Sequence, residues 1–133
     1  MVAKVKGRSG LWILPLLAVA SLVPASRDDL RLVEAVKNGD KAAVRSLLTQ
    51  HADVNAAQAD GTTALAWAAE RDDLQTAELL IQARANVNAA NDYGATPLWL
   101  ACTKANAAMV EKLLKAGANP NAALLTEIGR AHV

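Results

Sequence analysis

The fold is decided by Gly61-Thr62-Thr63-Ala64-Leu65-Ala66-Trp67-Ala68-Ala69, a stretch that returns 33 residues later as Gly94-Ala95-Thr96-Pro97-Leu98-Trp99-Leu100-Ala101-Cys102. The same spacing runs through three copies, and it is carried by Leu47, Leu80 and Leu113, by Val54, Val87 and Pro120, and by Asn55, Asn88 and Asn121. Similarity at a fixed period of this length is the signature of a repeat protein. One structural unit is therefore expected three times.

Each unit carries the signals of two helices. Thr63 and Thr96 precede short apolar runs and can cap an inner helix with their hydroxyls, and Pro97 suits the first helical turn. A second helix is expected to start near Asp73 or Asn106. Its apolar residues have the three-and-four spacing of a buried stripe, and they are Leu79, Leu80 and Ile81 in the second unit and Met109, Val110, Leu113 and Leu114 in the third.

The turn that ends the second helix is expected to differ between units. Gly117 suits a left-handed C-terminal cap, whereas the equivalent positions hold His51 and Arg84. A residue with a Cβ atom fits this conformation less well, so strain is predicted at these two turns.

These units closely resemble the ankyrin repeat. The resemblance is carried by Thr63-Ala64-Leu65 and Asn86-Val87-Asn88-Ala89 in the second unit, and by Thr96-Pro97-Leu98 and Gly117-Ala118-Asn119-Pro120-Asn121-Ala122 in the third. It implies an all-α ankyrin-repeat solenoid, in which stacked helix-turn-helix units are joined by inter-repeat hairpin loops. It also implies a concave surface that binds a partner protein, with contact positions at Lys37, Asn38, Asp60, Thr62, Glu70, Arg71, Asp92, Tyr93, Ala95, Thr103 and Lys104.

Among these positions Tyr93 is the strongest candidate, because an exposed aromatic residue on a loop tip is typical of binding hot spots. Trp67 and Trp99 lie one step out of phase in the motif. Packing between inner helices is the favoured interpretation for both, and more narrowly so for Trp99. An aromatic binding patch is the alternative.

The first 25 residues are interpreted as a signal peptide. Lys4, Lys6 and Arg8 precede an apolar stretch over 11–23, and a small-residue cleavage site ends at Ala25. The stretch is short for a membrane-spanning helix, although an uncleaved anchor is the alternative. Cleavage would place the chain in a bacterial periplasm or outside the cell.

The remaining chain is divided by its period. Residues 26–59 are predicted to form an N-terminal capping repeat, in which Arg27-Asp28-Asp29 replaces the usual opening; 60–92 and 93–122 are the next repeats. A further repeat begins over 123–133 and is truncated. Residues 127–133 resemble the translation of a sequencing-library adapter, with a natural tail as the alternative.

Composition and charge exclude some classes of function. The chain has 14 basic and 13 acidic residues, but three of the basic residues lie within the first eight, which leaves a net charge of about −2 over the rest and no basic footprint for nucleic acid. Cys102 cannot form an internal disulfide, since it is the only cysteine, and it is expected to be a small buried hydrophobe rather than a reactive thiol.

No catalytic constellation, metal-ligand spacing or cofactor motif is found in the sequence. The leading hypothesis is a non-catalytic, exported module that binds a partner protein. One alternative is the recognition arm of a larger exported enzyme, and another is a membrane-anchored structural spacer.

Overall fold

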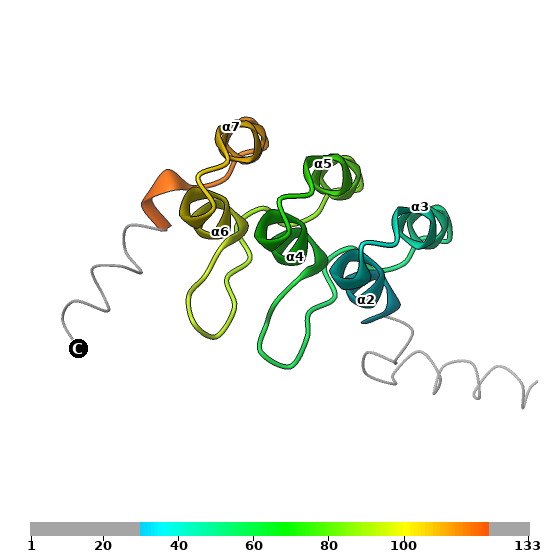
Figure 1. Ribbon diagram of the computed structural model, residues 1–133. Coiled ribbons are helices and arrows are strands. Elements are labelled where there is room, and N and C mark those ends of the chain that lie inside the picture. The colour runs from blue at the N-terminus through cyan, green and yellow to red at the C-terminus, as the bar shows by residue number, and fades with distance from the viewer. Residues whose placement is uncertain (1–29, 123–133) are drawn as a thin grey trace, which may run out of the picture.

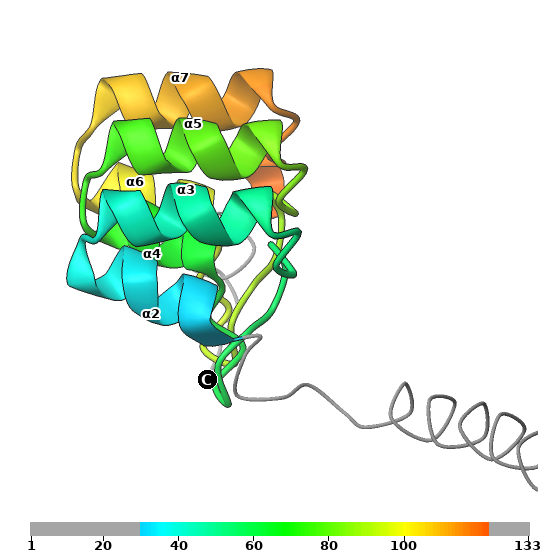
Figure 2. The same ribbon diagram turned by 90° about the vertical axis from the view of Figure 1, so that its right-hand side faces the viewer.

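The computed structural model describes residues 30–122, which form three helix pairs stacked side by side (Figure 1). The inner helices are α2 (Arg31–Asn38), α4 (Ala64–Glu70) and α6 (Pro97–Thr103), and the outer helices are α3 (Lys41–Thr49), α5 (Leu74–Gln82) and α7 (Ala107–Lys115). Figure 2 shows the outer helices as one layer of parallel rods. The predicted all-α solenoid of stacked helix-turn-helix units is confirmed.

The helices begin where the sequence indicates. The Thr63 hydroxyl accepts a hydrogen bond from the Ala66 amide at 3.3 Å, and the Thr96 hydroxyl accepts one from the Trp99 amide at 3.1 Å. Side-chain oxygens in the same role start the outer helices, which are capped by Asp40, Asp73 and Asn106. Each cap satisfies an amide that the first helical turn leaves without a partner.

Asp73 is the most strongly engaged of these caps. Its carboxylate accepts from the Thr76 amide at 3.1 Å and from the Thr76 hydroxyl at 2.6 Å, and Lys41 of the preceding repeat lies 3.6 Å away. Partial burial opposes ionisation, but the hydrogen bonds from Thr76 and the charge of Lys41 outweigh it and hold the pKa of Asp73 below its usual value. The cap therefore also links two repeats.

The core lies between the two helix layers and is built largely of leucine and alanine. Leu65, Ala68, Leu80 and Leu113 are fully buried. The predicted stripes are confirmed in part, because Met109 and Leu113 are buried whereas Leu79, Ile81 and Val110 are half-buried and Leu114 is 43% exposed. The small alanine side chains allow the inner helices to approach closely.

Left-handed backbone occurs at both kinds of turn. The predicted positions after the outer helices have φ of 60° at His51, 70° at Arg84 and 98° at Gly117. The turn between the two helices of a repeat was not predicted to be left-handed, yet it has the same conformation at Gly39, Asp72 and Ala105, with φ of 75°, 62° and 56°. In residues other than glycine this conformation causes backbone strain.

The periodic asparagines join one repeat to the next. The Asn55 side chain accepts a hydrogen bond from the Asn86 amide at 2.7 Å, and the Asn88 side chain accepts one from the Asn119 amide at the same distance. The 33-residue spacing of asparagine therefore reflects one repeated link in the inter-repeat loops.

Several predictions fall on residues that the structure does not describe. The signal peptide, the opening Arg27-Asp28-Asp29 and the segment 123–133 lie outside 30–122, and the repeat boundaries stay predictions. Within the described range, none of the helices is both long and apolar enough to span a membrane.

Candidate partner-binding surface

A groove of about 230 Å³ lies between the inter-repeat hairpins and the inner helices. Both hairpins extend from the inner side of the solenoid, beside α4 and α6 (Figure 1). We call this depression the hairpin groove, and the residues that line it are Asp60, Thr62, Ala66, Trp67, Glu70, Asn91 and Leu100.

The two hairpins hold each other in place. Gly61 and Gly94 turn the chain with φ of 81° and 78°, and the Asp92 amide donates to the Asp60 carbonyl at 2.8 Å. A Cβ atom on Gly61 would lie 3.2 Å from the Asn91 Cα, so the neighbouring hairpin leaves room for little more than glycine there. The groove is thus edged by two hairpins in direct contact.

Asn91 organises the second hairpin, although the sequence did not single it out. Its side-chain oxygen accepts from the amides of Tyr93 and Ala95, each at 3.0 Å, and its amide group donates to the Thr62 hydroxyl at 3.4 Å. Asparagine between alanine and aspartate carries no strong motif, but its ability to bond to nearby backbone in turns is a signal that could have identified it.

Two of the predicted contact positions need correction. Thr62 and Ala95 are only 8% and 5% exposed, because the two hairpins and Asn91 cover them. Thr62 lines the groove with little exposed surface, and both residues offer almost no surface to a partner.

Trp67 lines the groove and is half-buried. Its indole Nε1 donates to the Gln58 Oε1 at 2.9 Å, and the Lys37 Nζ lies 5.3 Å from the ring centroid, within range of a cation–π interaction. Trp67 therefore packs between repeats, as the favoured interpretation holds, and it also forms part of the groove wall. Its part in an aromatic binding patch stays a prediction. Trp99 is half-buried as well.

The predicted cations along the inner helices are tied to the neighbouring repeat. Lys104 forms an ion pair with Glu70 at 3.1 Å, and the Arg71 guanidinium donates to the Lys37 carbonyl at 3.0 Å. The Thr103 hydroxyl instead donates to the Leu100 carbonyl of its own helix at 2.7 Å. Exposed ion pairs of this kind add little stability, but they hold the charged side chains in defined positions.

Two carboxylates mark the hairpin tips. The amide and hydroxyl of Thr62 hydrogen-bond the Asp60 carboxylate and are the main reason that the pKa of Asp60 lies below its usual value. Asp92 is exposed on the next hairpin, and Tyr93 beside it is 68% exposed. Asn38 is exposed at the end of α2. The structure thus brings Asp60, Glu70, Asp92 and Lys104 around one groove, with Lys37 and Arg71 at its first-repeat side.

The expectation that Cys102 is buried is wrong. It is exposed on α6, because no described element packs over this side of the third repeat. Among residues 30–122 we find no cluster of three or more histidine, cysteine, aspartate or glutamate residues that could hold a metal ion.

Stacked helix pairs, paired hairpins and a groove beside them define a solenoid repeat protein. The family model for ankyrin repeats, in three copies, matches residues 32–123, and the chain belongs to this family. No curated protein matches the chain. Ankyrin repeats generally mediate protein–protein interaction, and such domains are typically non-catalytic.

Proposed function

We propose that this chain binds a partner protein through the hairpin groove and the hairpin tips beside it. The proposal is supported chiefly by one arrangement: Trp67 and Asn91 line the groove, and exposed Tyr93 lies two residues after Asn91 on the same hairpin. Aromatic residues beside a concavity are the usual anchors of protein interfaces. The proposed contact residues are those predicted from the sequence, with two changes. The buried Thr62 and Ala95 are removed, and Trp67 is added.

The groove also has groups that give a partner orientation. Asp60 and Glu70 line it, and Lys104 is held beside Glu70 by their ion pair. Charges held in fixed positions favour specificity and association rate more than affinity. A partner would therefore be selected by the order of acidic and basic groups along the inner helices.

Replacement of Tyr93 by alanine tests the proposal. Captured proteins are identified on the immobilised chain, and their Kd values are measured for the parent, Tyr93→Ala and the outer-helix control Gln82→Ala. Loss of a hot-spot aromatic costs about 2 kcal/mol, so binding should weaken roughly 30-fold in Tyr93→Ala. Equal affinity in all three proteins, with unchanged helical content, would exclude Tyr93 and its hairpin tip as the anchor of the interface.

Export of the chain is part of the proposal. It is supported by the basic start, the apolar stretch and the small-residue cleavage site in residues 1–25. We expect cleavage after Ala25 in a bacterial host and the mature chain in the periplasm or the medium. Mass spectrometry of the mature N-terminus checks this: Ser26 as first residue supports export, whereas an intact leader favours the membrane-anchored spacer. The recognition arm of a larger enzyme stays an alternative prediction.

A further inference from the structure

The charged residues that line the hairpin groove are all acidic. They are Asp60 and Glu70, and no lysine or arginine lines the groove with them. Glu70 is neutralised by Lys104, since the two side chains form an ion pair at 3.1 Å. The ion pairs formed among residues 30–122 do not include Asp60. The groove therefore has one uncompensated negative charge in its wall.

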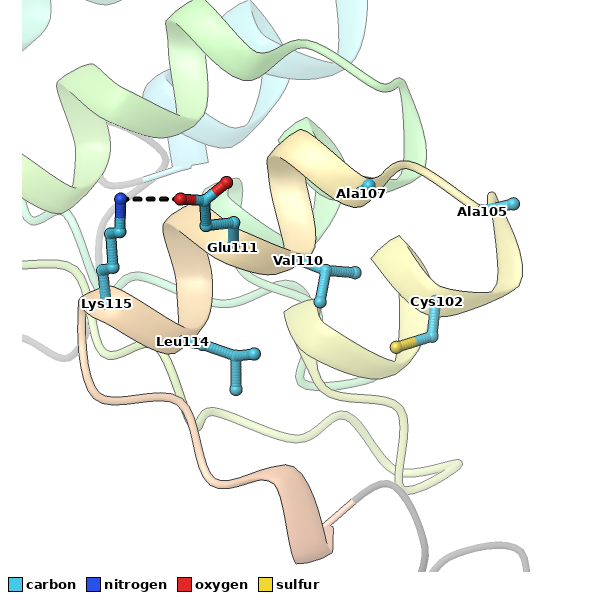
Figure 3. A pocket seen from close by; sticks show the side chains of 7 residues that line it. All are labelled: Cys102, Ala105, Ala107, Val110, Glu111, Leu114 and Lys115. Atoms are coloured by element: carbon cyan, nitrogen blue, oxygen red, sulfur yellow. Dashed lines mark ion pairs between the residues drawn. The ribbon is translucent and has the colours of Figure 1, made fainter.

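Two other depressions on the described part of the chain have a different charge. The larger one, of about 500 Å³ beside α6 and α7, is lined by one acidic and one basic residue (Figure 3). Figure 3 shows that these two, Glu111 and Lys115, face each other, and they pair at 2.7 Å. The depression between α3 and α5 has Arg45 as its charged residue. Of the three depressions, the hairpin groove alone attracts a cation.

The second hairpin adds a further carboxylate next to Asp60. The Asp92 amide donates to the Asp60 carbonyl at 2.8 Å, so the two residues lie side by side where the hairpins touch. Asp92 is exposed, and it too is absent from the ion pairs among residues 30–122. The hairpin segments 56–63 and 89–95 contain no lysine or arginine. The hairpins thus offer negative charge that they do not balance themselves.

The aromatic wall of the groove is held in one orientation. The Trp67 Nε1 donates to the Gln58 Oε1 at 2.9 Å, which fixes the indole plane. The Lys37 Nζ lies 5.3 Å from the ring centroid, so this ring already attracts one cation. Because Lys37 does not line the groove, the part of the ring inside the groove is left for another group.

The Asp60 carboxylate is held in place as well. Its Oδ1 accepts from the Thr62 amide at 3.0 Å, and hydrogen bonds from Thr62 keep the pKa of Asp60 below its usual value. A carboxylate has several acceptor positions, so this turn leaves Asp60 able to accept from a ligand. The groove of about 230 Å³ is smaller than the roughly 300–1,000 Å³ of pockets for drug-sized ligands, and it suits a single side chain.

We infer that the hairpin groove receives an arginine side chain of the partner, with the guanidinium bonded to the Asp60 carboxylate and packed against the Trp67 ring. The inference rests on the proposed function and gives the chemistry of the partner, a basic segment. Arginine is favoured over lysine because its planar group can stack on an aromatic ring and bond to a carboxylate at the same time. Asp92 favours a further basic residue beside it.

Peptide libraries with a fixed central residue and random flanking residues test the inference on the full chain. Labelled libraries with arginine, lysine, citrulline or glutamate at the centre are titrated by fluorescence polarisation. Citrulline has the shape of arginine without its charge. We expect the arginine library to bind roughly 10-fold more tightly than the citrulline library, because the charge-assisted hydrogen bond to Asp60 is lost with the charge. The glutamate library should bind most weakly.

Asp60→Asn is the test variant and Asp53→Asn is its matched control. Both aspartates accept a hydrogen bond from the amide two residues on, Asp60 from Thr62 at 3.0 Å and Asp53 from Asn55 at 2.9 Å. Asparagine retains the accepting oxygen, so each turn persists and only the charge is removed. Asp53 does not line the groove. The preference for arginine over citrulline should disappear in Asp60→Asn and persist in Asp53→Asn.

Several outcomes would overturn the inference: no library binds, the parent binds the arginine and citrulline libraries equally, or Asp60→Asn keeps the preference. Equal loss in Asp53→Asn would show that net charge alone matters, and preference for the glutamate library would mean an acidic partner. Failure of the proposed function itself is a separate result, in which captured partners bind Tyr93→Ala as tightly as the parent.

Discussion

Replacing Ala105 by glycine should make this protein more stable. Ala105 ends the turn between α6 and α7 with φ of 56°, a left-handed conformation in which its Cβ atom crowds the backbone. Its methyl group is exposed, and its amide donates to the Cys102 carbonyl at 3.0 Å, a bond that glycine retains. The substitution therefore removes a source of strain and no structural hydrogen bond.

The size of the gain is the difference of two terms. A left-handed residue with a Cβ atom costs about 1–2 kcal/mol, and the extra freedom of glycine in the unfolded chain costs about 0.5–1 kcal/mol. The free energy of unfolding should thus rise by about 0.5–1 kcal/mol, equivalent to a Tm increase of roughly 2–8 °C for a domain of this size. Gly39 already fills the equivalent position in the first repeat, with φ of 75°.

Urea titration followed by far-ultraviolet circular dichroism measures the effect, and Ala108→Gly is the matched control. Ala108 is an exposed alanine too, but it lies within α7, where glycine should lower the free energy of unfolding by about 0.5–1 kcal/mol. The same chemical change is therefore expected to have opposite signs three residues apart. If both variants are destabilised equally, backbone strain at Ala105 does not lower the free energy of unfolding of the parent protein.

Two other properties can be checked by the same titration. Leu80→Ala should lower the free energy of unfolding by about 2–5 kcal/mol, because Leu80 is fully buried in the central repeat, whereas alanine at half-buried Leu79 should cost less. Asp73 has a folded-state pKa below its unfolded value, so its ionised form contributes stability that is present above the unfolded pKa and is lost as pH falls through the folded pKa. The stability difference between the parent and Asp73→Asn should therefore shrink on acidification below the unfolded pKa; a constant difference would show that the carboxylate charge is not what stabilises this cap.

The helices could be predicted from the sequence because their signals are local. A threonine before an apolar run caps an inner helix, and an aspartate or asparagine before the next run caps an outer one, whatever the rest of the chain does. The left-handed turns at His51 and Arg84 followed from comparison with Gly117. Asp72 and Ala105 were missed because neither residue type marks a left-handed turn strongly, and here the helix pair imposes the conformation.

Burial at the site could not be predicted in the same way. Thr62 and Ala95 occupy positions that face a partner in the motif, yet they are covered because neighbouring hairpins make direct contact. The prediction for Cys102 was wrong in the opposite direction, because this residue was expected to be buried and is exposed. The equivalent helix position is buried in the first two repeats and exposed in the third. Burial in a solenoid depends on the neighbouring repeat, and a period in the sequence predicts the repeat itself but not how well its neighbour covers it.

The hairpin groove is no more stable than the stacking of the repeats that form it. Glu70 meets Lys104 only across the contact between the second and third repeats, and the Asp60 carbonyl meets the Asp92 amide where the two hairpins touch. In a linear array each repeat is stabilised by its neighbours, and within residues 30–122 the third repeat has a neighbour on one side only. Local opening of the third repeat would therefore dismantle the hairpin groove while the first two repeats stay stacked. A contact that covers Cys102 and Val110 on the third repeat would oppose this opening, and it would thereby stabilise a groove that it does not touch.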